Sequence, residues 1–162
     1  MSNDALFSLG MDLVAPSTAQ KEDFPIQTDG SDESEGRKDH FIVKNGVRCA
    51  GTHLIIDIIK ASRLDDIAHI ERTLIDCVER AGATLLHIHL HHFEPNGGVS
   101  GVAVLAESHI SIHSWPENGY AALDVFMCGD ARPELCVDVL REAFQPEKLV
   151  VSEHLRGRGV PA

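Results

Sequence analysis

The sequence predicts an α+β fold, a two-layer sandwich in which helices pack on one face of a largely antiparallel sheet. Three observations support this prediction. Short apolar segments with strand periodicity alternate with two segments of helical periodicity, in the order strand, helix, strands, helix, strand. Tight turns containing Gly, Pro or Asn separate neighbouring strands, as in antiparallel hairpins. Each helical segment has one apolar stripe, so each can cover one face of the sheet.

The first elements are a strand and a helix. Residues 53–59 are short, apolar and β-branched, and we interpret them as a buried strand. The next helix begins near residue 67, because Asp65 or Asp66 can cap its free N–H groups. It ends at Gly82, a residue typical of helix termini. Its apolar stripe consists of Ile67, Ile70, Leu74, Cys77 and Val78.

The second half of the fold contains a hairpin and a second helix. Residues 99–106 predict a strand, and residues 108–113 and 120–127 predict two more, joined by a turn at residues 115–119. This hairpin should return Cys128 to the neighbourhood of Ser108. Pro133 then opens a helix. Its stripe consists of Leu135, Val139, Leu140 and Ala143, and a last strand covers residues 148–152.

Composition limits the function classes. The net charge of −11 argues against a nucleic-acid partner, because phosphate binding needs a basic surface. No apolar run is long enough for a transmembrane helix, and no signal-peptide pattern or Cys-x-x-Cys pair is present, so we expect a cytoplasmic protein. Residues 1–45 are rich in Ser, Gly and acidic side chains and predict a disordered extension. Residues 46–162 form the predicted folded domain.

Ten histidines raise the question of a metal site. In the predicted strand at residues 84–93, His87, His89 and His91 share one face, opposite Leu86, Ile88 and Leu90. Neutral imidazoles bind zinc well. Neighbours on this face lie about 6.5–7 Å apart, which is long for shared tetrahedral binding. We therefore expect no metal, although a non-catalytic metal-binding module stays as a distant alternative.

Three reactive side chains, Ser108, His113 and Cys128, lie on the predicted hairpin. Ser108 and His113 are five residues apart on one strand, so they point to opposite faces. This argues against a Ser-His hydrolase, and no Gly-x-Ser-x-Gly motif surrounds the serine. No local signature of a Cys-His protease is present either. These residues indicate chemistry without identifying the reaction.

The motif around the hairpin identifies a family. Residues 107–129, ESHISIHSWPENGYAALDVFMCG, closely resemble the small prokaryotic S-adenosylmethionine decarboxylases, and residues 93–101, FEPNGGVSG, are similar to the segment that precedes this motif in the family. The resemblance extends more loosely over residues 51–155. The acidic N-terminal extension is not a usual part of the family. A joined motif of this length is far more specific than a short pattern.

The resemblance implies a proenzyme that cleaves itself between Glu107 and Ser108. The products would be a β chain, residues 1–107, and an α chain, residues 108–162, which starts with a pyruvoyl group derived from Ser108. His113, assisted by Ser100, would act as acid and base in self-cleavage. Cys128 would donate a proton to the substrate after decarboxylation.

The resemblance also implies the substrate and the assembly. The pyruvoyl group would form a Schiff base with S-adenosylmethionine, and the product would supply aminopropyl groups for spermidine synthesis. Phe93 would stack on the adenine and Glu117 would bind the ribose. A homodimer with sites built from both subunits is expected. A pyruvoyl-dependent decarboxylase of arginine or ornithine on the same scaffold stays as the alternative.

Overall fold

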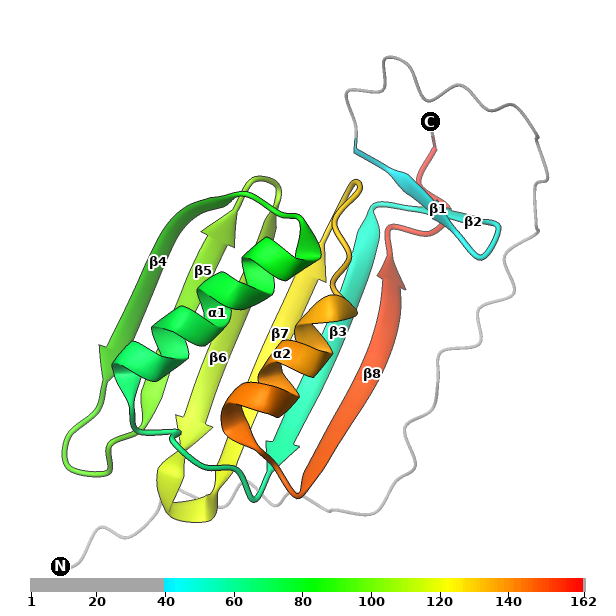
Figure 1. Cartoon of the computed structure of the whole chain (residues 1–162). Helices are drawn as coiled ribbons and strands as arrows, with labels where there is room; N and C mark the ends of the chain where they lie inside the picture. The colour runs from blue at the N-terminus through cyan, green and yellow to red at the C-terminus, as the bar shows by residue number, and fades with distance from the viewer. Residues whose placement is uncertain (1–39, 162) are drawn as a thin grey trace, which may run out of the picture.

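The computed structural model describes residues 40–161 and has two layers, a six-stranded sheet and two helices that cross one of its faces (Figure 1). The predicted fold class is confirmed. The elements are β1 Ile42–Lys44, β2 Val47–Cys49, β3 Gly51–Ile59, α1 Ile67–Ala81, β4 Leu85–His92, β5 Val99–Leu105, β6 Ser108–Trp115, η1 Pro116–Asn118, β7 Tyr120–Met127, α2 Leu135–Phe144 and β8 Lys148–Arg156.

The sheet has the strand order β4-β5-β6-β7-β3-β8, and every neighbouring pair is antiparallel. Consecutive tight connections link β4 to β7 in order. Helix α1 carries the chain from β3 to the edge strand β4, and α2 carries it from β7 past β3 to the other edge, β8 (Figure 1). Strands β1 and β2 form a small separate hairpin beyond one end of the sheet.

The core lies between the sheet and the helices. Alternate residues of the central strands are buried on this side, where they meet the buried residues of both helices. Ile67, predicted to belong to the apolar stripe of α1, is instead 37% exposed. The side chain of Asp66 accepts a hydrogen bond from the His69 N–H at 2.9 Å, and Gly82 ends α1 with a φ of 74°, so both predicted helix boundaries are confirmed. The buried residues of α2 are Cys136, Leu140 and Phe144.

The opposite face of the sheet carries no helix, and we call it the open face. Strand β3, interpreted above as buried, is buried on one side only, because His53, Ile55 and Asp57 alternate onto the open face. Leu86 is 64% exposed and does not share the inner face with Ile88 and Leu90. The reason is a β-bulge between Leu85 and His87, which shifts the alternation by one residue.

Two further differences concern the ends of the domain. Strand β8 extends four residues beyond the predicted end at Ser152. The β1–β2 hairpin was not predicted, and β1 lies within residues assigned to the extension. Residues 1–39 lie outside the described part of the chain, so the disorder expected for them stays a prediction. Within residues 40–161, neither helix is long and apolar enough to cross a membrane.

Leu140→Ala should lower the free energy of unfolding by about 2–5 kcal/mol, because it leaves a cavity between α2 and the sheet where Leu140 is fully buried. Urea denaturation followed by circular dichroism measures this. The Ser108→Ala background keeps the predicted cleavage from dividing the chain. The exposed neighbour Arg141 provides the matched control, and Arg141→Ala should change the free energy by less than about 0.5 kcal/mol. Equal effects of the two substitutions would contradict this packing.

Candidate active site

The turn between β5 and β6 holds the predicted cleavage site. It consists of only Ala106 and Glu107, because Leu105 and Ser108 are already paired across the two strands. Glu107 has a φ of 62°. This left-handed conformation costs a non-glycine residue roughly 1–2 kcal/mol. The peptide bond between Glu107 and Ser108 therefore lies in a locally strained backbone.

Cys128 lies directly against this turn, as the predicted hairpin requires. The N–H group of Cys128 donates a hydrogen bond to Ser108 Oγ at 3.2 Å. Its thiol lies 3.1 Å from the carbonyl oxygen of Glu107 and donates to it. One residue thus contacts both the hydroxyl group and the carbonyl group on the two sides of the Glu107–Ser108 bond.

The surroundings of Cys128 favour the neutral thiol. Burial is the largest cause that raises the pKa of Cys128, and the negative charge of Glu107 raises it further. The hydrogen bond with Ser108 acts in the opposite direction but is smaller than burial. A thiol with a raised pKa keeps its proton near neutral pH, so it can donate that proton.

Ser100 and His113 form a second polar group, at the other end of the sheet. They face each other across β5 and β6, and Ser100 Oγ lies 2.8 Å from His113 Nδ1. Both point to the open face, where the hydroxyl can orient the imidazole ring. The predicted assistance of His113 by Ser100 thus has a matching contact.

A groove of about 340 Å³ adjoins this pair. Phe93, which is 48% exposed, and Glu117, in η1, both line it. Gly98 lets the loop before β5 lie close to β6, since a Cβ at this position would lie 2.9 Å from the carbonyl oxygen of Ser114. The remaining lining residues are Glu94, Pro95, Asn96, Ser114 and Trp115.

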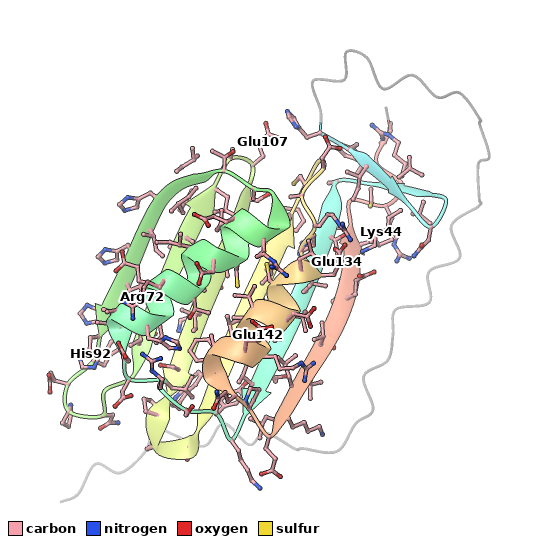
Figure 2. All side chains as sticks on the ribbon, viewed as in Figure 1. Lys44, Arg72, His92, Glu107, Glu134 and Glu142 are labelled. Carbon is pink, nitrogen blue, oxygen red and sulfur yellow. The ribbon has the colours of Figure 1, made fainter. Side chains whose placement is uncertain are left out.

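The two groups are far apart within one chain. Ser108 and His113 are separated by five residues of β6, which corresponds to roughly 17 Å at the rise of a strand. Figure 2 shows Glu107 and His92 at opposite ends of the sheet. Glu107 is next to Ser108 in the chain, and His92 is next to His91, which pairs with Ser100. The structure therefore brings Ser108 to Cys128, and His113 to Ser100, Phe93 and Glu117, but it keeps these two sets apart.

A further polar cluster on the open face was not predicted. His53 Nε2 lies 3.2 Å from Asp124 Oδ1, and Ser111 Oγ donates to Asp124 Oδ2 at 3.4 Å. Arg156 lies 3.1 Å from His53 Nδ1. Burial, followed by the charge of His53, lowers the pKa of the adjacent His109. The sequence signal that could have predicted this cluster is the presence of polar residues at alternate positions of otherwise apolar strands.

Tyr120 and Asp57 form another unpredicted contact on this face. The Tyr120 hydroxyl donates to Asp57 Oδ1 at 2.6 Å, and this bond is the main cause that raises the pKa of Tyr120 to about 12. Tyr120 also stacks on Trp115, with ring centroids 5.3 Å apart. The pair fixes the end of the β6–β7 hairpin next to the groove.

The predicted stripe of His87, His89 and His91 lies on β4 and is exposed. Between residues 40 and 161, no group of three or more His, Cys, Asp or Glu side chains is arranged to hold a metal ion.

Comparisons with known proteins agree on one family. A family model described as S-adenosylmethionine decarboxylase matches residues 52–157. The S-adenosylmethionine decarboxylase proenzyme of Thermomicrobium roseum is 42% identical over 112 residues, 68% of this chain and 97% of that protein. The proenzyme of Parasynechococcus marenigrum is 50% identical over 101 residues, 60% of this chain and 78% of that protein. The crystal structure of the adenosylmethionine decarboxylase from Aquifex aeolicus is similar, with a TM-score of 0.61 and 32% identity, over 67% of this chain and 92% of that chain.

Alkylation by iodoacetamide should test the environment of Cys128. Because burial and Glu107 raise its pKa, the pH at half-maximal reaction rate should lie above that of a free cysteine. Glu107→Gln removes the negative charge, so it should move this pH downward. Peptide mass spectrometry of the Ser108→Ala chain separates Cys128 from the three buried cysteines. A midpoint below that of free cysteine would contradict the raised pKa.

Proposed function

This chain belongs to the S-adenosylmethionine decarboxylase family, and on that premise we propose that it cleaves itself between Glu107 and Ser108 and then decarboxylates S-adenosylmethionine. The observation that carries the proposal is the strained Glu107–Ser108 turn with Cys128 against both sides of its peptide bond. As in the family, the decarboxylated product would supply aminopropyl groups for polyamine synthesis.

Self-cleavage would use the hydroxyl group of Ser108 as an internal nucleophile. Its oxygen attacks the Glu107 carbonyl carbon, the peptide C–N bond breaks, and an ester replaces the amide while the Ser108 nitrogen becomes a free amine. Loss of the Ser108 α-proton then expels the Glu107 carboxylate and leaves dehydroalanine. Tautomerisation gives an imine, water replaces its nitrogen by oxygen, and ammonia leaves. A pyruvoyl group now begins the α chain.

Two features support this route. The left-handed backbone of Glu107 stores strain that cleavage relieves. The Cys128 thiol donates to the Glu107 carbonyl oxygen, where negative charge develops during the attack. The acyl shift needs a hydroxyl on the residue that follows the scissile bond, and Ser108 occupies that position.

The surroundings of Ser108 also fit the mature group. The pyruvoyl group supplies an electron sink for the electron pair left when CO₂ departs. Cys128 is placed beside Ser108, and its raised pKa keeps a proton available for the substrate carbon. The contact of its thiol with the Glu107 carbonyl must open first, and cleavage of the chain frees Glu107 to move.

A complete site would need two copies of the chain. His113 lies roughly 17 Å from Ser108 along β6. Ser100 contacts His113, and Phe93 and Glu117 line the groove beside this pair. Two open faces related by a twofold axis, with their strands reversed, would place the His113 end of one copy against the Ser108 end of the other. The open face suits such a contact, because Ile55, Val104 and Trp115 are at least 40% exposed there.

In this arrangement each residue has a defined role. His113, oriented by Ser100, moves protons during self-cleavage in the partner copy. Phe93 stacks on the adenine ring, and the Glu117 carboxylate accepts hydrogen bonds from the ribose hydroxyls. The groove of about 340 Å³ between them gives room for the nucleoside part of the substrate.

The thiols favour a reducing compartment. Cys49, Cys77, Cys128 and Cys136 are all free, and the proposed role of Cys128 requires a thiol. We therefore place the enzyme in the cytoplasm.

CO₂ release from S-adenosylmethionine, arginine and ornithine, measured side by side, tests the substrate. S-adenosylmethionine should react faster by on the order of a hundredfold or more, because the Phe93 groove offers an aromatic surface for adenine that the amino acids cannot use. Ser108→Ala should release no CO₂ from any of them. Preference for arginine or ornithine would replace the proposed substrate by the alternative on the same scaffold.

Mixing two inactive variants tests the composite site. Ser108→Ala removes the nucleophile, and His113→Ala removes the acid and base, so each alone should stay largely uncut. When the two are co-expressed, the His113→Ala chain should be cleaved, because its Ser108 meets the His113 of the partner. Mass spectrometry identifies the cleaved chain. If the mixture stays as uncut as the separate variants, the site does not combine residues from two copies.

A further inference from the structure

A segment outside the matched family region contacts the cleavage site. The family model begins at residue 52, whereas His40 and the β1–β2 hairpin precede it. Figure 1 shows this hairpin at the same end of the sheet as the β5–β6 turn and the β7–α2 connection. The extra segment therefore lies at the end that carries Glu107, Ser108 and Cys128.

His40 contacts the two neighbouring chain segments of this site. Its Nδ1 lies 3.0 Å from Glu107 Oε2, and the two side chains are each 53% exposed. Its carbonyl oxygen accepts a hydrogen bond of 3.1 Å from the N–H of Gly129, the residue after Cys128. A Cβ built on Gly129 would lie 3.7 Å from His40 Nδ1, so the His40 ring also lies against this glycine.

These contacts lie beside the cleavage site. Glu107 supplies the carbonyl group that Ser108 would attack, and Cys128 supplies the thiol that polarises it. His40 touches none of the reacting atoms. It connects the side chain of Glu107 to the backbone next to Cys128, and it does so at the border of a groove of about 630 Å³ formed by β1 and residues 129–134.

We propose that His40 is a positioning residue for self-cleavage. The contact of its imidazole ring with the Glu107 carboxylate holds Glu107 in the left-handed turn, and its carbonyl group holds Gly129 so that the Cys128 thiol stays on the Glu107 carbonyl oxygen. The proposal rests on the proposed function, because it assigns His40 to the Glu107–Ser108 cleavage. It adds a contribution from a segment that the family region does not include.

A series of charges at position 40 tests this role. His40 has a φ of 48°, so Lys, Ala and Glu at this position all have the same left-handed backbone penalty and differ mainly in charge. Freshly synthesised chains are followed by denaturing gel and mass spectrometry over time. His40→Lys should cleave within about twofold of the wild-type rate. His40→Ala should be about three- to fivefold slower, the range of an exposed ion pair, and His40→Glu slower still.

Lys44 provides the matched control on the same hairpin. It forms an exposed ion pair of 2.8 Å with Glu153 on β8, away from Glu107. Lys44→Ala should cleave within about twofold of the wild-type rate. If Lys44→Ala slows cleavage as much as His40→Ala, the hairpin acts through general stability, and a specific role of His40 is overturned.

A double-mutant cycle with Glu107→Gln isolates the pair. In the Glu107→Gln background, Lys, Ala and Glu at position 40 should differ by less than about twofold, because the charge that His40 holds is gone. If wild-type chains cleave and all the position-40 variants cleave at the same rate, the role of His40 is overturned and the proposed function stands. Wild-type chains that stay intact overturn the proposed function and this role together.

Discussion

The two-residue turn between β5 and β6 is the constraint on which the site depends. Both flanking strands are held in an antiparallel ladder, and Leu105 pairs with Ser108 immediately beside the turn. Glu107 must reverse the chain within that short span and adopts a positive φ. A longer loop would let this residue relax. The sheet thus maintains strain at one peptide bond and at the same time fixes Ser108, the residue that follows it.

The same sheet explains why Cys128 is present at this bond and His113 is not. Strands β6 and β7 form a hairpin, so the residue that follows β7 returns to the start of β6, where Cys128 reaches Ser108 and Glu107. His113 is on β6 itself and is separated from Ser108 by the length of the strand. A rigid strand cannot fold back to join its two ends. The proposed second copy, with its strands reversed, would bring both groups together.

The sequence predicts much of the fold and part of the site. The period-2 pattern around the β6–β7 turn was sufficient to place Cys128 near Ser108, and Asp66 and Gly82 were sufficient to bound α1. The roles proposed for Phe93 and Glu117 came from the resemblance of the motif to a family. Their common groove depends on the approach of Gly98 to Ser114. The bulge before His87 could not be predicted, because alternation alone does not reveal an extra residue.

His40 was missed for a different reason. It lies in an acidic, polar stretch whose composition predicts disorder, and its contacts with Glu107 and Gly129 join residues more than sixty positions apart. The most direct test of the central claim, that Ser108 becomes the reactive group, is mass spectrometry of the purified protein after hydrazide treatment. Two chains should be found, and the smaller should carry the hydrazide on a carbonyl group at its first residue. A chain that stays intact, or a smaller chain that begins with a free serine amine, would contradict the account.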